Sequence, residues 1–285
     1  MRVAVIGLGL IGSSIGLGLK QANWQEAEII GYVRRPEVAS SALRLGAIDK
    51  AESSLTKTVQ DANLVIVATP TLVTKDIFSQ IAIALSPEAI VTDTASTKLQ
   101  IMEWAEELLP SGISFIGGHP MAGKETFGIE AAEASLFRNC IYCLTPAPRA
   151  KPAAIQIVMD MIEKLGATPL IMNKQEHDNL VAGISHLPLL LSAALVSVIT
   201  KDPSYELMSQ LAGSGYRDVT RLASGNPEVN AQICLSNRSA IISWIDKFSE
   251  ELLRVRGLVA KGDNDIQKAL AAASEARQKW LEKRY

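Results

Sequence analysis

The chemistry of this chain is indicated first by three glycines near its start. Gly7, Gly9 and Gly12 follow a short apolar, β-branched run in G-x-G-x-x-G spacing, and small and apolar residues come after them. A strand, a glycine turn and a helix in this order form a dinucleotide-binding fingerprint. The first turn of the helix, with Leu10 and Ile11, would present free N–H groups and the positive end of the helix dipole to phosphate. We therefore expect a bound dinucleotide; the alternative is an ordinary strand–helix turn.

The residues after the second predicted strand indicate which dinucleotide is bound. That strand ends in Tyr32, Arg34 and Arg35 follow it, and no acid occurs until Glu37. An Asp or Glu about twenty residues after the glycines would bind the ribose 2′-hydroxyl and repel a 2′-phosphate. Two guanidinium groups instead clamp a phosphate through charge-assisted, bidentate bonds. The sequence therefore favours NADP over NAD, unless the two arginines are a solvated surface pair.

Two later loops are expected at the same edge of the sheet. Thr69 and Pro70 end one buried strand, and a loop with Ser96 and Thr97 leaves the next. Open α/β sheets bind ligands at the carboxyl ends of their strands, so both loops should face the cofactor. The hydroxyl of Ser96 is then well placed to bond an imidazole or a nicotinamide amide. Ser96 is also suited to cap a helix that begins at Thr97.

The chain has three histidines, and each has a different expected environment. His119 lies in the glycine-rich segment 117–123 after a strand, and such a loop position is more often functional than structural. We expect His119 to be catalytic; the alternative is a hydrogen bond that holds the loop. His186 lies on an apolar helix, where a ligand contact and a satisfied core histidine are about equally expected. His177 has polar neighbours and is expected to be solvated at a helix start.

Two arginines indicate the charge of the substrate. Arg217 and Arg221 are spaced i, i+4 and should share one face of a helix. Beside an apolar domain, this pair suits a dicarboxylate or a zwitterion with two carboxylates. The alternative is surface ion pairing, including a pair with Asp218.

Composition and charge exclude several classes of protein. The 285 residues are 48% hydrophobic and 20% charged, which is enough for two domains with a sizeable core. A net charge of −2 gives no electrostatic basis for binding nucleic acid or a membrane surface. Cys140 and Cys143 form a C-x-x-C pair, but they flank an apolar strand without a second ligand pair, so we expect neither a metal site nor a redox motif. Because the first strand begins at the N-terminus, we expect no signal peptide and a cytoplasmic protein.

An α/β fold must position these residues. Apolar runs alternate with helical periodicity over residues 1–173, which predicts a Rossmann-type doubly wound sheet and a dinucleotide-binding domain. Helices are expected over residues 71–85 and 152–165, among others. The predicted strands cover residues 3–6, 28–32, 64–68, 89–92, 113–116, 140–144 and 168–172.

The pattern changes at residue 174, beyond which only helical periodicities remain. Residues 180–200 are apolar enough to raise the question of a membrane span, but a histidine, a proline and several hydroxyl residues argue against it. A helix that is apolar all round is more often a buried spine. With amphipathic helices over 238–259 and 264–280, residues 174–285 are predicted to form an all-α dimerisation and substrate domain.

Five motifs in this chain resemble a known family. Over nearly its whole length the chain is similar to the prephenate/arogenate dehydrogenases of tyrosine biosynthesis. The motifs are GLGLIG at 7–12, DTASTK at 93–98, GGHPMAG at 117–123, SHLP at 185–188 and RDVTR at 217–221.

The resemblance implies a fold and a reaction. The fold is a dinucleotide-binding domain followed by an all-helical dimerisation domain. The reaction is oxidative decarboxylation of a cyclohexadienol: hydride leaves ring C4 for the nicotinamide, CO2 leaves C1, and the ring becomes aromatic. Neutral His119 would accept the proton of the C4 hydroxyl as general base. Ser96 would orient His119 and the nicotinamide.

The resemblance also implies a set of substrate contacts. Arg221 should pair with the ring carboxylate. Arg217, expected from the partner subunit of a homodimer, should reach the side-chain carboxylate, and Asp218 can receive an ammonium group. His186 and Gly123 lie in matching motifs and are expected in the same site.

Two departures from the family pattern bear on the substrate. Family members that use prephenate typically carry a histidine directly after the Leu-Pro of the fourth motif, where this chain has Leu189. A histidine can donate a hydrogen bond to the keto oxygen of prephenate, whereas leucine cannot, so arogenate, which carries an ammonium group there, is the expected substrate. Many members also have an aromatic residue where this chain has Asn230.

Three other functions remain as alternatives to arogenate oxidation. The first is prephenate oxidation to 4-hydroxyphenylpyruvate. The second is a β-hydroxyacid dehydrogenase, which would need a catalytic lysine in the helical domain, for which Lys174 is the nearby candidate. The third is a non-catalytic dimer that senses NADP.

Overall fold

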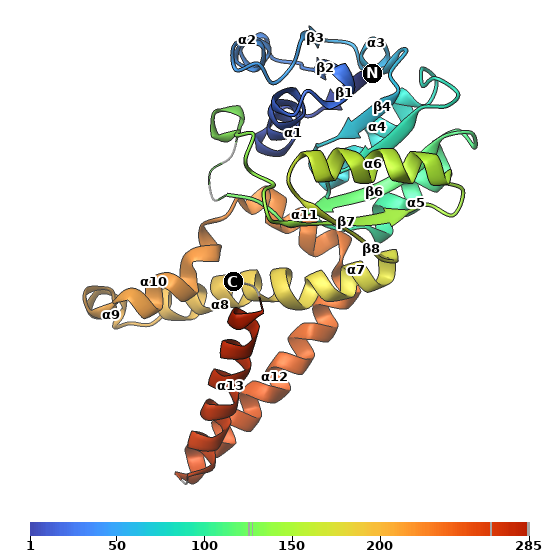
Figure 1. Ribbon diagram of the computed structural model, residues 1–285. Helices are drawn as coiled ribbons and strands as arrows, with labels where there is room; N and C mark the ends of the chain where they lie inside the picture. Colours follow the sequence, from blue (N-terminus) through green and yellow to red (C-terminus); the bar gives the residue numbers. More distant parts are fainter. Residues whose placement is uncertain (125, 127, 263, 284–285) are drawn as a thin grey trace. The chain divides into compact units, whose positions relative to one another are not determined.

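The computed structural model describes residues 1–124, 126, 128–262 and 264–283, and an eight-stranded sheet organises its first part (Figure 1). The strand order is β3-β2-β1-β4-β5-β6-β7-β8, so the chain winds outward from β1 in both directions. All neighbouring strands are parallel except β6 and β7. This confirms the expected Rossmann-type doubly wound sheet. The strands are β1 (Arg2–Ile6), β2 (Glu28–Tyr32), β3 (Lys50–Glu52), β4 (Leu64–Val67), β5 (Ile90–Asp93), β6 (Ser114–Pro120), β7 (Ile141–Pro146) and β8 (Thr168–Ile171).

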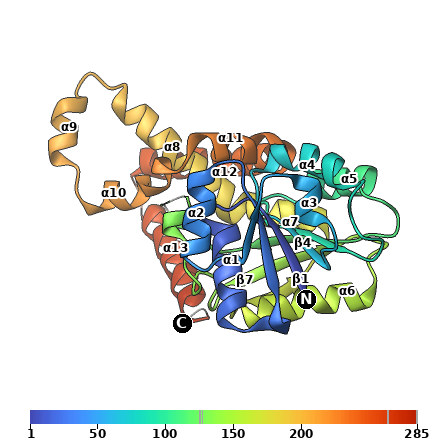
Figure 2. The same cartoon turned by 90° about the horizontal axis from the view of Figure 1, so that it is seen from above.

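Helices cover both faces of the sheet, which explains the unbroken apolar runs of its central strands. Alternate residues of β1 belong to two separate cores: Val3 and Val5 to one, Ala4 and Ile6 to the other. Helices α1 (Leu10–Gln21), α2 (Pro36–Arg44) and α6 (Pro152–Lys164) pack over the first core (Figure 2). Helices α3 (Leu55–Val59), α4 (Thr74–Ile81) and α5 (Leu99–Leu108) pack over the second.

The sheet differs from the sequence prediction near the candidate catalytic histidine. Strand β6 continues through Gly117 and Gly118 to Pro120, so His119 is a strand residue paired with Cys143 and not part of a loop. The antiparallel partner β7 supplies the hydrogen bonds that keep the glycines extended. Strand β3 was not predicted, because three residues with two charges carry no apolar signal.

The part of the described chain that follows β8 contains helices and no strand, as expected. A run from Lys174 to Thr200 consists of α7 (Lys174–Val181), a π turn (Ala182–His186) and α8 (Leu187–Thr200). By length and hydropathy this run meets the criteria for a membrane span, with 22% of its most apolar window buried. The remaining elements of this region are α9 (Tyr205–Leu211), α10 (Ser214–Thr220), a 3₁₀ turn (Arg221–Ser224) and α11 (Pro227–Ser236).

Contacts between Cα atoms divide the chain into two compact units, Met1–Arg238 and Ser239–Tyr285. The second unit contains α13 (Asp265–Glu282) and, apart from its first residue, α12 (Arg238–Lys261), close to the two predicted amphipathic helices. The predicted domain boundary at residue 173 stays a prediction.

Candidate active site

The glycine turn after β1 leaves room at one point for a ligand. Gly7 has a φ of +102°, and a Cβ there would lie 2.4 Å from the carbonyl oxygen of Ala68. A Cβ on Gly12 would lie 2.0 Å from the carbonyl oxygen of Gly7, so the helix sits against the turn. A Cβ on Gly9 would meet nothing within 4 Å. The first and third glycines are thus fixed by packing, and the second faces open space, as a pyrophosphate would require.

The N-terminus of α1 is free to receive an anion. Its N-cap is Gly9, which has no side chain to accept from the first peptide groups, and its first turn contains no acid. The N–H groups of Leu10 and Ile11 lie in this turn and carry the positive end of the helix dipole. The turn fits a phosphate group.

A cavity of about 980 Å³ adjoins the turn. It also contains residues from the ends of β2 and β4, which flank the point where the strand order reverses. The side chain of Arg35 is 75% exposed and lies 4.0 Å from Glu37, so it can turn to a ligand without leaving a buried partner. Of the residues predicted to bind the cofactor, those that line this cavity are Gly7, Gly9, Arg34, Arg35, Thr69 and Pro70.

The catalytic candidate His119 belongs to a buried hydrogen-bonded chain. Its Nδ1 lies 2.9 Å from Nε2 of His177, and Nδ1 of His177 lies 2.7 Å from Oδ1 of Asp178. The two carboxylate oxygens of Asp178 also accept from the peptide N–H groups of Lys98, at 2.7 Å, and Leu99, at 2.8 Å. Asp178 therefore caps α5 and at the same time ends the histidine chain.

A buried ion pair supports the end of β6. Lys98 is fully buried; its Nζ contacts the carboxylate of Asp93 and donates to the carbonyl oxygen of Gly118 at 2.6 Å. The other oxygen of Asp93 accepts from the N–H of Gly118 at 3.0 Å. Both backbone groups of the residue before His119 are thus held by charged side chains, which fixes where His119 projects.

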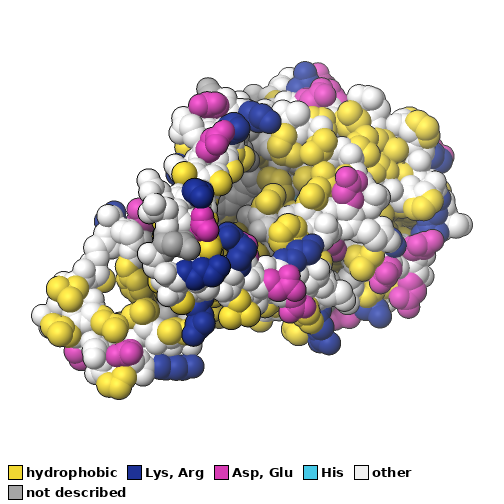
Figure 3. Space-filling view, turned by 90° about the horizontal axis from the view of Figure 1, so that it is seen from below, with side chains coloured by type: hydrophobic (Ala, Val, Ile, Leu, Met, Phe, Trp, Pro, Cys, Tyr) yellow, Lys and Arg dark blue, Asp and Glu magenta, His cyan; other side chains and the backbone are white. Residues whose placement is uncertain are grey.

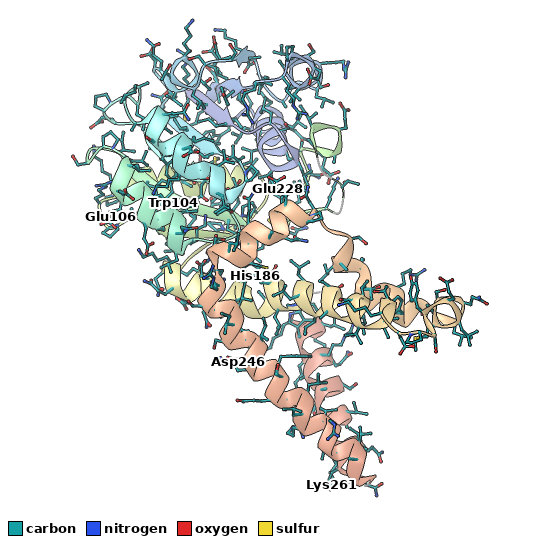
Figure 4. The ribbon with its side chains drawn as sticks, turned by 180° about the vertical axis from the view of Figure 1, so that it is seen from behind. Trp104, Glu106, His186, Glu228, Asp246 and Lys261 are labelled. Atoms are coloured by element: carbon teal, nitrogen blue, oxygen red, sulfur yellow. The ribbon has the colours of Figure 1, made fainter. Side chains whose placement is uncertain are left out.

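His186 lies beside this chain, so the three histidines of the sequence form one cluster. Its Nδ1 is 3.3 Å from Nδ2 of Asn237, which donates to the carbonyl oxygen of Asp178 at 2.7 Å. Its Nε2 is buried and has no partner among the described residues. Figure 4 labels His186 at the junction of α7 and α8. A buried imidazole nitrogen that lacks a hydrogen-bond partner in this position is suited to bind a polar atom of a ligand.

Two imidazoles of the cluster, those of His119 and His186, are kept neutral by their surroundings. Burial lowers the pKa of His119 well below its usual value, and the neighbouring His177, Lys98 and His186 lower it further. Burial also lowers the pKa of His186 to about 4, although Asp178 opposes the shift. Both side chains are therefore neutral near pH 7, and a neutral imidazole is the form that accepts a proton.

Several predictions about these residues were wrong. His177 is fully buried and bonded to His119, not solvated. Helix α5 begins at Leu99 and not at Thr97, and Asp178, not Ser96, accepts from its first N–H groups. Ser96 itself is half-buried in the loop after β5, outside the lining of the large cavity.

Unlike His186, which lies beside His119, the other expected substrate contacts are exposed in the single chain. Arg217 and Asp218 lie on α10, are 79% and 70% exposed, and form an ion pair at 3.5 Å. Arg221 is the C-cap residue of α10, with helical backbone angles, and the first residue of the 3₁₀ turn that follows. Helix α9 projects with α10 beyond the end of α8 (Figure 1). Gly123 is exposed in the loop after β6, and a Cβ at this position would have no neighbour within 4 Å.

Lys174, the candidate catalytic lysine of a β-hydroxyacid dehydrogenase, lies elsewhere. It lines a separate cavity of about 270 Å³ with Phe115, Thr145 and Arg149. Among the residues that the structure describes, no three His, Cys, Asp or Glu side chains are arranged to hold a metal ion.

Comparison with known proteins identifies relatives that match most of the chain. Residues 15–170 match the family model "Prephenate dehydrogenase, nucleotide-binding domain", and residues 173–272 match "Prephenate dehydrogenase, dimerization domain". The prephenate dehydrogenase of Bacillus subtilis is 35% identical over 92% of this chain and 71% of its own length.

Solved structures agree with this assignment. The Synechocystis arogenate dehydrogenase superimposes with a TM-score of 0.85 at 32% identity, covering 98% of this chain and all of its own. The Aquifex aeolicus prephenate dehydrogenase, in complex with hydroxyphenyl propionate and NAD+, gives a TM-score of 0.91 at 27% identity and covers 98% of each chain. A 3-hydroxyisobutyrate dehydrogenase from Mycobacterium tuberculosis, at 15% identity and a TM-score of 0.54, shares the fold alone.

Proposed function

Because the chain belongs to the prephenate dehydrogenase family, we propose that it catalyses the NADP-dependent oxidative decarboxylation of arogenate to tyrosine. The observation that carries this proposal is a buried, neutral His119 at the carboxyl edge of the sheet, two strands from a cavity suited to a dinucleotide. We assign the dinucleotide-binding domain to residues 1–173 and the helical dimerisation and substrate domain to residues 174–285. The enzyme then acts as a cytoplasmic homodimer.

The protein's part in the reaction is to hold the substrate and to move one proton. A bound nicotinamide supplies the hydride acceptor. Nε2 of His119 takes the proton of the C4 hydroxyl as hydride leaves C4. The C1–carboxylate bond then breaks, CO2 departs, and the electron pair of that bond makes the ring an aromatic phenolate, which takes the proton back. Ser96 orients the reacting groups from the loop after β5. Because the product is aromatic, alignment at C4 is the main requirement that the protein must meet.

The substrate's charges match the remaining candidate residues. In this proposal Arg221 binds the ring carboxylate, and Arg217 reaches in from the partner subunit, which is consistent with its exposure in the single chain. Asp218 receives the ammonium group. Gly123 leaves space at the entrance, and the free Nε2 of His186 binds a polar group of the substrate.

The preference for arogenate is supported by Leu189, which lies on α8 three residues after His186. Leucine offers no donor to the keto oxygen of prephenate, and an unpaired oxygen costs roughly 1–3 kcal/mol, on the order of tenfold to a hundredfold in selectivity. An ammonium group needs an acceptor instead of a donor.

The deciding measurement is kcat/KM for arogenate and for prephenate, in the wild type and in Leu189→His. We expect the wild type to favour arogenate strongly and the variant to gain activity on prephenate. Leu190→His, one position further along α8, is the matched control and should gain none. Equal use of both substrates by the wild type would contradict the arogenate assignment.

The preference for NADP is supported by Arg34 and Arg35 in the lining of the cavity, with no acid on β2 after its first residue. Replacing both arginines by alanine should raise KM for NADP far more than KM for NAD, because only NADP carries the 2′-phosphate. Arg44→Ala, on α2 but outside the cavity, is the control. A wild-type enzyme that prefers NAD would contradict this assignment.

A further inference from the structure

We propose that His177 and Asp178 are positioning residues which fix the tautomer of His119 and take up the positive charge that forms when His119 accepts a proton. The tautomer follows from the hydrogen-bond geometry together with the premise that His177 is neutral; the kinetic part rests on the proposed function. The sequence gives neither residue a role in the site, and it predicts that His177 is solvated.

The hydrogen-bond partners of Asp178 determine where the protons are. Its carboxylate accepts from the peptide N–H of Lys98 and from that of Leu99, which are donors only. A carboxylate so bound remains an acceptor, so the nitrogen that faces it, Nδ1 of His177 at 2.7 Å, carries a proton.

The proton on His177 then determines the proton on His119. A neutral imidazole with Nδ1–H has a lone pair on Nε2, and Nε2 of His177 lies 2.9 Å from Nδ1 of His119. Nδ1 of His119 must therefore be the donor. The lone pair of His119 is left on Nε2, the nitrogen that is free for a substrate.

The hydrogen bonds from His119 to His177 and Asp178 also provide a path that moves the positive charge away from His119. The substrate hydroxyl gives its proton to Nε2 of His119, and its O–H electron pair forms the second bond of a C4 carbonyl as hydride leaves C4. The proton returns along the same path when loss of CO2 makes the ring a phenolate. The Nδ1 proton of His119 passes to Nε2 of His177. His119 is then neutral again, and the imidazolium of His177 faces the Asp178 carboxylate.

The charged surroundings explain why this transfer matters. Buried Lys98, from the loop after β5, and His186, from the π turn, both disfavour a cation on His119, while Asp93 on β5 is already paired with Lys98. Among the described residues, Asp178 on α7 is the carboxylate that faces the histidine chain directly. A proton moved to His177 lies next to that carboxylate and one ring further from the bulk of the site.

The tautomers can be observed directly by ¹⁵N NMR of histidine-labelled protein, since the chain contributes only three imidazoles. At pH 7.5 we expect both His119 and His177 in the wild type to be protonated on Nδ1 and unprotonated on Nε2. In His177→Phe, which keeps a ring against His119 without its nitrogens, His119 should lose this preference. A wild-type His119 protonated on Nε2 would overturn the proposal.

Kinetics test the charge uptake. Asp178→Asn and His177→Phe should each lower kcat by about 10²-fold or more with little change in KM, as expected when a catalytic imidazole loses the group that orients it. Removing the Asp178 charge destabilises the protonated form of the His119–His177 pair, so this pair takes up its proton at lower pH. The acidic limb of the kcat profile should therefore move to lower pH.

Two further comparisons keep these tests decisive. Asp178→Asn also weakens the cap of α5, whereas His177→Phe leaves the Asp178 bonds to Lys98 and Leu99 in place, so a loss confined to the first variant would overturn the proposal. Glu176→Gln removes a neighbouring exposed charge and should change neither kcat nor the acidic limb. If the wild type turned over neither arogenate nor prephenate, the proposed function would fail, and the NMR assignment would still stand or fall by itself.

Discussion

His119 is held by neighbours on every side that the structure describes except at Nε2. The charged groups of Lys98 and Asp93 fix the backbone before it, the antiparallel strand β7 pairs with it, and His177 binds its Nδ1. If His119 is the base, as we propose, its fixed position means that little entropy is lost when it meets its substrate. Because single hydrogen bonds hold His119 in place, single substitutions should change substrate binding and the rate of the chemical step separately.

Replacing His119 by asparagine tests the base itself. Asparagine keeps a polar group near Nδ1 but offers no basic nitrogen, so kcat should fall by about 10²-fold or more while NADP binding is kept. Steady-state kinetics and a cofactor titration measure the two effects. Near-normal turnover would remove His119 from the mechanism.

His186 should make stability depend on pH. Its pKa is lowered to about 4 in the folded protein, so between pH 6.5 and pH 4 the unfolded chain takes up a proton that the folded chain does not. Stability must then fall as the pH falls through this window, by on the order of 3 kcal/mol for a shift of this size. His119 acts in the same direction.

Urea unfolding at several pH values between 4.5 and 7.5 measures this loss. His186→Gln should flatten the dependence, because glutamine does not titrate. A wild-type free energy of unfolding that is constant over the window would show that His186 is not buried as a neutral base.

At the scale of elements, α11 ties the helical region to the two loops expected at the cofactor. Oε1 of Gln232 accepts from the N–H of Leu72 at 3.2 Å, just after Thr69 and Pro70. The hydroxyl of Ser236 lies 2.9 Å from that of Thr97, next to Ser96. Helix α11 therefore braces both loops from outside the sheet.

Removing one of these bonds should loosen the cofactor site. Gln232→Ala deletes a hydrogen bond of about 1 kcal/mol, so KM for NADP should rise about fivefold with kcat little changed. Glu228→Ala, on an exposed position of the same helix (Figure 4), is the control. Equal effects of the two changes would show that α11 contributes only overall stability.

Sequence patterns were sufficient to predict the elements that are marked by a continuous run of apolar residues. The strands near residues 3–6 and 28–32 were predicted within a residue, because unbroken apolar runs report burial on both faces. His177 could not be placed this way: its neighbours are polar, and its burial comes from β6, far away in sequence. The extension of β6 through two glycines likewise depends on pairing with β7. Long-range contacts, which a single sequence does not display, account for both errors.

At the scale of the whole molecule, the end of the helical region exposes apolar side chains that a monomer has no reason to carry. Val198 on α8, Leu207 and Leu211 on α9, and Val219 on α10 are 68%, 61%, 78% and 59% exposed. Figure 3 shows apolar side chains over this end of the molecule. An exposed patch of this kind usually marks a protein–protein interface, and the matching family model is that of a dimerisation domain.

Light scattering should therefore report a dimer of twice 30.6 kDa. Val198→Glu combined with Leu211→Glu should shift the protein toward monomer and abolish activity, because Arg217 would no longer reach the partner's site. Ile83→Glu, at a position 88% exposed after α4, is the control and should leave the dimer intact. A stable, active monomer would contradict both the assembly and the role of Arg217.

The π turn at Ala182–His186 determines how α8 is rotated about its axis relative to α7. Each residue of an α-helix advances about 100° around its axis, and a π turn holds one residue more than an α-turn. Helix α7 presents His177 and Asp178 to the sheet, and α8 begins directly after the turn. Deleting one residue of the turn would rotate α8 by about 100° relative to Asp178. The extra residue of the π turn therefore sets how α8 is rotated about its axis relative to His177 and Asp178 on α7.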